Sequence, residues 1–164
     1  MKITIAVMAV LAALIVPTAF ATTPAQAPSA FCKANAALIG AGKTYATMGD
    51  CVSKQAALAA GNRTNAAKAC KAEMADAAFA ASHGNKTFDQ FYGTSAGNGK
   101  GKGNGNAFGT CVSQKAGAKT ADQQSAQVNA ARKCRTPDLK AQVGSGKTYR
   151  NFGACVAAQG KAAS

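Results

Sequence analysis

Residues 43–53 read KTYATMGDCVS and residues 147–157 read KTYRNFGACVA, so the Lys-Thr-Tyr triplet, the glycine and the Cys-Val pair recur at identical spacing. A third copy is split into two parts, KTFDQF at residues 86–91 and NAFGTCVS at residues 106–113. Self-similarity of this kind is the signature of a chain built from repeated structural units. The sequence therefore predicts three such units.

A cysteine followed by a basic residue precedes each copy. These cysteines are Cys32, Cys70 and Cys134. Each predicted unit contains one of these cysteines, and the units span about residues 29–60, 65–117 and 120–164. Between the two parts of the split copy, residues 95–105 are rich in glycine, asparagine and lysine. This composition is typical of a flexible loop.

The composition predicts an all-α fold with a thin core. After residue 21, only 15 of 143 residues are leucine, isoleucine, valine or phenylalanine, which by itself is typical of a disordered chain. Alanine, however, supplies 35 of those residues and is the best helix former. No segment alternates β-branched with polar residues, so we expect no sheet. Six cysteines in the same region indicate disulfides that supplement the core.

Local signals place the helices. The alanine-rich stretch 65–82 is predicted to be one helix closed by Gly84, although Phe79 falls on the side opposite its apolar stripe. Thr120 with Gln123 resembles a capping box, which predicts a helix from there to about Arg135. Three further expected helices follow a glycine or a short polar cap and begin near Cys51, Cys111 and Cys155.

The end of the chain carries one more start signal. Thr136 and Pro137 form an N-cap and first-turn proline pair, and Gly144 is the expected stop of the helix they open.

Helix placement favours one disulfide pairing among the fifteen that six cysteines allow. Bridges from Cys51 to Cys70, or from Cys111 to Cys134, would join opposite ends of helical segments about 28 Å or more in length. Disulfide Cα atoms lie within about 7 Å of each other. The favoured bridges are Cys32 to Cys51, Cys70 to Cys111 and Cys134 to Cys155. The alternative is a partly reduced, flexible chain.

The N-terminus predicts export. Lys2 precedes the apolar run 3–16, and residues 19–21 read AFA, the small-x-small pattern of a signal peptidase site. We therefore expect residues 1–21 to be a signal peptide and residues 22–164 to be a single mature domain. This domain is expected to be secreted or to reside in the periplasm or cell envelope. The alternative is a membrane anchor, but the apolar run is shorter than the roughly 20 residues of a bilayer span, and Pro17 interrupts its end. No transmembrane anchor is expected after processing.

Three segments carry a resemblance. Residues 66–73 read AAKACKAE, residues 91–94 read FYGT and residues 106–113 read NAFGTCVS. Together they resemble a motif that recurs in uncharacterised exported bacterial proteins. The resemblance covers about a third of the chain and implies a bacterial secreted or envelope protein, with no activity attached to it. The residue before the second cysteine is usually basic in that motif, whereas it is Thr110 here.

Motifs typical of catalysis or cofactor binding are weak. Residues 37–44 and 141–148 fit a relaxed phosphate-loop pattern, but no predicted strand precedes either, so we expect no nucleotide. Without a Cys-x-x-Cys pair we expect no metal, and no cofactor is indicated. His83 is the single histidine and is interpreted as a solvated residue at a helix end. Glu73 and Asp76 are interpreted as offsetting nearby lysines rather than as a hydrolase pair.

Positive charge is the remaining functional signal. The full sequence has a net charge of +13, and the segment from residue 100 onward holds eleven basic residues against two acidic ones. Such a field attracts polyanions, here nucleic acid, teichoic acid or lipopolysaccharide. The alternative is an unspecific, solubilising surface. The candidate polyanion-binding residues are Lys100, Lys102, Arg132, Lys133, Arg135 and Lys140.

These observations lead to a functional hypothesis without catalytic residues. We expect an exported, non-enzymatic cationic binding or structural protein of the envelope or extracellular space. The alternative is a small secreted enzyme that acts on cell-wall polymer.

Overall fold

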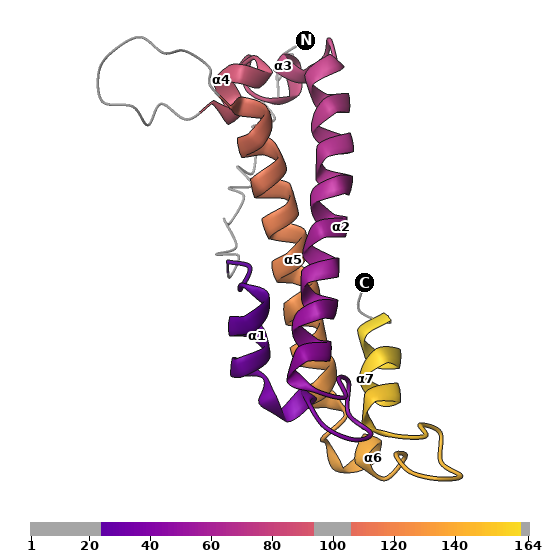
Figure 1. Cartoon of the computed structure of the whole chain (residues 1–164). Coiled ribbons are helices and arrows are strands. Elements are labelled where there is room, and N and C mark those ends of the chain that lie inside the picture. Colours follow the sequence, from indigo (N-terminus) through magenta and orange to yellow (C-terminus); the bar gives the residue numbers. More distant parts are fainter. Residues whose placement is uncertain (1–23, 94–105, 162–164) are drawn as a thin grey trace, which may run out of the picture.

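The computed structural model describes residues 24–93 and 106–161, and within these ranges the chain is helical with no strand (Figure 1). The predicted all-α class is therefore confirmed for the described residues. The predicted signal peptide 1–21 and the predicted loop 95–105 lie outside them. In chain order the elements are α1 (Pro28–Ala34), the 3-10 helix η1 (Ala36–Leu38), α2 (Met48–Ala75), α3 (Phe79–Ser82), α4 (Phe88–Tyr92), α5 (Ala107–Lys133), α6 (Pro137–Lys140) and α7 (Phe152–Lys161).

Two long helices, α2 and α5, form the frame of the molecule. They lie side by side and run in opposite directions (Figure 1). At one end α1 packs on α2, α7 packs on α5, and α6 lies close by; we call this the basal end. At the other end lie α3 and α4, and α4 packs against α5; we call this the apical end.

Helix α2 is longer than the sequence indicates at its start and shorter at its end. It begins after Thr47, whose hydroxyl accepts a hydrogen bond from the Asp50 N–H (3.1 Å), and it runs without a break through residue 65. The predicted continuation to Ser82 is wrong, because the chain leaves the helix at Asp76, whose carboxylate accepts from the Ala78 N–H (2.8 Å). The break turns Phe79 inward, which explains its place off the apolar stripe.

Helix α5 begins near Cys111 as predicted, with the Asn106 side chain accepting from the Gly109 N–H (3.0 Å). The predicted helix start at Thr120 is wrong, because this residue is buried in the middle of α5. Its hydroxyl donates to the Ala116 carbonyl (2.7 Å), which a residue inside a helix can do and an N-cap residue cannot. The helix ends at Lys133, two residues from the predicted end.

The predicted turn after α5 has the expected chemistry. Thr136 is the N-cap of α6 and Pro137 occupies its first turn. The helix lasts only four residues and ends at Lys140, so Gly144 lies in the following loop with a φ of 143° rather than at the helix stop.

Three disulfides join the helices in series, in the pairing that the sequence favours. Cys32 of α1 bonds to Cys51 of α2, with the Cα atoms 6.0 Å apart. The second bridge joins α2 to α5 and the third joins the end of α5 to α7, each across 6.1 Å. The six cysteines are Cys32, Cys51, Cys70, Cys111, Cys134 and Cys155, and none of them is free.

The large apolar side chains form two separate clusters, one at each end of the helix pair. The basal core centres on Phe31, Leu38, Tyr45 and Val156, together with two of the disulfides. The apical core is smaller and contains the second disulfide, Cys70–Cys111, and the aromatic residues Phe79, Phe88 and Tyr92.

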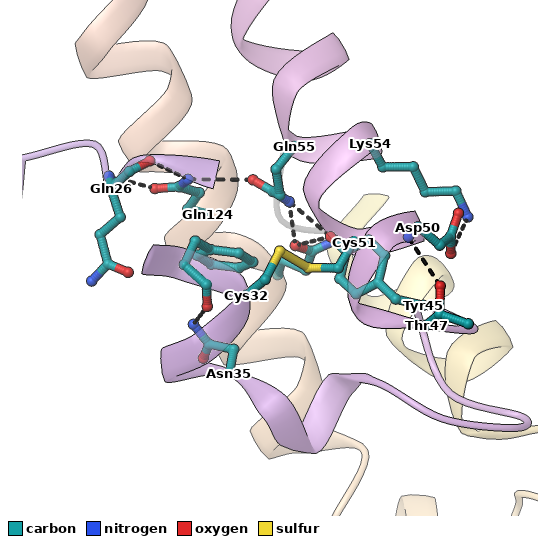
Figure 2. Close-up of a disulfide and its surroundings, with 12 residues drawn as sticks. Gln26, Cys32, Asn35, Tyr45, Thr47, Asp50, Cys51, Lys54, Gln55 and Gln124 are labelled. Atoms are coloured by element: carbon teal, nitrogen blue, oxygen red, sulfur yellow. Dashed lines mark hydrogen bonds and ion pairs between the residues drawn. A yellow bond between two sulfur atoms is a disulfide. The ribbon is translucent and has the colours of Figure 1, made fainter. Parts of the chain in front are cut away.

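A buried polar layer lies between the cores, beside the first disulfide (Figure 2). The Gln55 amide nitrogen donates to the Tyr45 hydroxyl (2.7 Å) and to the Gln127 carbonyl (3.1 Å). The Gln55 carbonyl in turn accepts from the Gln124 amide (3.3 Å). Two turns further along α2, the Asn62 amide donates to Thr120 (3.0 Å) and Gln123 (2.7 Å) of α5.

Two loops at the basal end have the same backbone geometry, and both contain the Gly-x-Gly-Lys-Thr-Tyr sequence. Gly40 and Gly144 have φ angles of 137° and 143°, and Gly42 and Gly146 have φ angles of 70° and 72°, a region open mainly to glycine. In each loop the N–H of the first glycine donates to the tyrosine carbonyl across 2.8 Å.

Within residues 24–93 and 106–161, no helix is both long and apolar enough to cross a membrane.

Candidate functional site

The structure gathers four of the predicted polyanion-binding residues at the basal end. Arg132 and Lys133 lie in the last turn of α5, Arg135 follows the helix, and Lys140 ends α6. All four side chains are exposed. The other two candidates, Lys100 and Lys102, lie outside the described residues.

Further cations, which sequence reasoning did not select, come to the same end from elements far apart in the chain. They are Lys33, Lys43, Lys147 and Arg150, and all are exposed. The acidic residues in these basal segments are Asp50 and Asp138, and Asp50 forms an ion pair with Lys54 across 3.1 Å. The basal end therefore has a marked excess of positive charge.

The basal cations have no acidic partners in the described part of the chain. The side-chain ion pairs there are Lys54 with Asp50 and Lys115 with Glu73, and neither includes Arg132, Lys133 or Arg135. Because an exposed cation without a carboxylate partner keeps its field for other anions, this arrangement favours contact with an external anion.

The first basal loop, residues 40–45, contacts the start of α7, whose first residue is Phe152. The Gly153 N–H of α7 donates to the Gly42 carbonyl of this loop (3.0 Å). This contact places the Lys43 ammonium 5.8 Å from the Phe152 ring centroid, and the Arg135 guanidinium lies 5.7 Å from the same centroid. Both lie within the range of a cation–π contact. No sequence signal links Lys43 with Arg135, because only the folded chain brings both residues to the Phe152 ring.

The phosphate-loop pattern has a different structural role here. Residues 37–44 and 141–148 form the basal loops just described, and no strand precedes either of them. The Lys43 ammonium donates to the Ala37 carbonyl of its own loop (3.1 Å). No group of three or more metal-ligating side chains occurs among the described residues.

The apical end holds the charged cluster around Glu73. Its carboxylate pairs with the Lys115 ammonium (2.7 Å) and accepts from the Tyr92 hydroxyl (2.9 Å). Partial burial alone would raise the pKa of the Glu73 carboxyl, but the bonds from Lys115 and Tyr92 outweigh it and lower that pKa below its usual value. The expectation that Glu73 offsets the lysines next to it in sequence is wrong, because α5 brings Lys115 closer.

His83 is half-buried at the end of α3 rather than fully solvated. Its ring stacks on Phe79 with the centroids 3.8 Å apart, and its Nδ1 lies 2.8 Å from the Phe79 carbonyl oxygen. Among the described residues, the one nucleophilic side chain bonded to it is that of Ser82, whose hydroxyl lies 2.9 Å from the same nitrogen and also bonds the Phe79 carbonyl. Without a free cysteine nearby, this histidine has the surroundings of a packing residue.

Comparisons with known proteins leave the class of the protein to be argued from its own residues. No protein-family model matches the chain, and neither a curated protein nor a solved structure matches it.

Proposed function

We propose that the protein is an exported, non-enzymatic binding protein that attaches to anionic polymers through its basal end. The observation that carries the proposal is that Lys43, from the loop after η1, lies at the same end as Arg132, Lys133 and Arg135 of the α5 C-terminus, all four exposed and without acidic partners among the described residues. Several like charges on one end of a small molecule create a field that concentrates polyanions there. Nucleic acid, teichoic acid and lipopolysaccharide share the phosphate groups that such a surface recognises.

Export is part of the same proposal. Three disulfides in so small a chain are typical of an oxidising compartment outside the cytosol. The N-terminal pattern of residues 1–21 independently favours secretion, with removal of the segment by a signal peptidase. The resemblance to exported bacterial proteins favours the cell envelope or the extracellular space as the destination.

The test is a salt titration of binding to duplex DNA and to teichoic acid. For duplex DNA the log of affinity should fall linearly with log salt, with a slope of about 0.9 for each neutralised phosphate. The triple variant Arg132→Gln, Lys133→Gln, Arg135→Gln should weaken binding and reduce that slope by up to about three times this amount. Teichoic acid should show the same salt dependence in sign.

The matched control changes three exposed lysines away from the basal end. They are Lys68, Lys71 and Lys86. Their replacement by glutamine removes the same total charge, so binding should weaken less than in the basal variant. Equal weakening by both variants would assign the effect to net charge alone, and affinity indifferent to salt would overturn the proposal. Turnover of a cell-wall polymer in the same assays would support the enzymatic alternative.

A further inference from the structure

A groove runs along α5 on the side that faces α1. Its volume is about 430 Å³, within the range of small-ligand sites. One wall is a stripe of α5 from Ala121 to Arg132, and the other is α1 with the segment 24–27 that precedes it. Both walls contribute residues to the basal core, and the first disulfide fixes α1 to α2.

The α5 wall presents three polar side chains in a row. Ser125, Asn129 and Arg132 are spaced four and three residues apart, so they lie on one face of the helix. All three are exposed and line the groove. Within the described part of the chain, none of the three side chains takes part in a hydrogen bond or an ion pair, so their hydrogen-bonding capacity is available to a ligand.

The same wall already binds a peptide main chain. Figure 2 shows the Gln124 amide facing Gln26, and both main-chain groups of Gln26 are bonded to it. The Gln26 N–H donates to the Gln124 carbonyl (2.9 Å), and the Gln26 carbonyl accepts from the Gln124 amide nitrogen (3.0 Å). Ala27, the next residue, has the extended angles φ −58° and ψ 145°. A side chain of the α5 wall thus bonds both polar groups of a peptide main chain, here that of the opposite wall.

The lining also indicates which ligand class fits. Arg132 is its one ionisable side chain, and a guanidinium fork matches a carboxylate with two parallel hydrogen bonds. Phe31 lines the groove but is only 1% exposed, so it offers no ring face on which a sugar could stack. Asn129 and Ser125 supply the donors and acceptors that amide groups require.

We propose that this groove binds a short extended peptide by its free C-terminal carboxylate. The carboxylate pairs with Arg132, and the preceding amide groups bond to Asn129 and Ser125. This site goes beyond the attachment to anionic polymers and does not depend on it, although Arg132 contributes to both.

The test is a titration of the oxidised, ¹⁵N-labelled mature protein with N-acetyl-trialanine, followed by amide chemical shifts. The shifts should concentrate on residues 121–132 and 31–35. The same peptide with a C-terminal amide should bind at least tenfold more weakly, and so should the acid form to Arg132→Gln. The control Lys133→Gln removes a neighbouring cation that does not line the groove, and it should keep full affinity.

A second variant separates this proposal from the first. Asn129→Leu keeps every charge, so it should abolish peptide binding while leaving the salt dependence of DNA binding unchanged. If the triple basal variant loses DNA binding but the unmutated protein binds no peptide, the groove proposal is wrong and the proposed attachment to anionic polymers still stands. Equal affinity for the acid and the amide peptide, or shifts scattered away from the groove, would also overturn it.

Discussion

Gln55 is 2% exposed, yet every polar atom of its side chain has a partner. A buried amide is costly unless its hydrogen bonds are satisfied, so Gln55 can be buried only when α5 has one axial position relative to α2. The alanine-rich faces of α2 and α5 offer similar contacts at successive turns and therefore define this position weakly. We infer that the Gln55 bonds, with those of Asn62, set the register of the two helices.

Replacing Gln55 by alanine should destabilise the fold by about 1–3 kcal/mol, because the Tyr45, Gln124 and Gln127 groups then lose a buried partner. The measurement is urea denaturation followed by circular dichroism. Gln114 is the matched control, an exposed glutamine in α5 whose side chain bonds to none of the described residues. Gln114→Ala should change stability by no more than about 0.5 kcal/mol. Similar losses in both variants would contradict the assigned role.

At the residue scale, the sequence was informative where one distance limit decides the answer. The cysteine pairing follows from helix length and disulfide reach, and the bridges have that pairing. Contacts between residues about a hundred positions apart follow no such rule. The spacing of Ser125 and Asn129 in the sequence places them on one face of a helix. It does not predict that α1 lies opposite this face, so the groove itself could not be predicted.

At the element scale, local signals identified helices but not their ends. The sequence separated a helix near Cys51 from one starting at residue 65, whereas α2 is continuous, because alanine favours propagation wherever no residue stops it. The Thr120 pattern is a valid capping signal that occurs inside α5, where the hydroxyl bonds to Ala116 and accepts from Asn62. The burial of Thr120 against α2 therefore outweighed its local capping signal.

The contact between the first basal loop, residues 40–45, and α7 depends on Gly153. A Cβ atom at Gly153 would clash with the backbone carbonyl of Lys43, and backbone on that side cannot rotate away as a side chain can. Gly153→Ala should therefore destabilise the fold by about 1–3 kcal/mol through overpacking and should displace Lys43 from Phe152. Thermal melting gives the stability change, and the shifts of the Phe152 ring protons report the displacement.

Gly160, in the same helix, is the control. A Cβ atom there meets nothing within 4 Å, so Gly160→Ala should raise stability by about 0.5–1 kcal/mol through helix propensity alone. Stabilisation by both substitutions would show that the loop contact at Gly153 is not close.

At the scale of the whole molecule, the fold is two small cores joined by a polar layer. All six half-cystines are buried within the cores, so each bridge is both a crosslink and a packing element. The charge also differs between the ends, because Arg132, Lys133 and Arg135 lie at the basal end without an ion pair in the described residues, whereas the paired Glu73 and Lys115 lie at the apical end. Neither division is readable from composition, since both depend on the antiparallel arrangement of α2 and α5.

Reduction of the disulfides should therefore abolish cooperative unfolding of the whole chain. The closed loops have sequence separations of 19, 41 and 21 residues, and the chain-entropy relation gives each bridge roughly 3–4 kcal/mol. Their combined contribution is comparable with the entire stability of a small domain, about 5–15 kcal/mol. Calorimetry of the oxidised protein should show one sharp transition, and the protein reduced without denaturant should show none, while the alanine-rich helices keep part of their circular dichroism signal. A reduced protein that still melts sharply near the same temperature would show that the two cores suffice without the bridges.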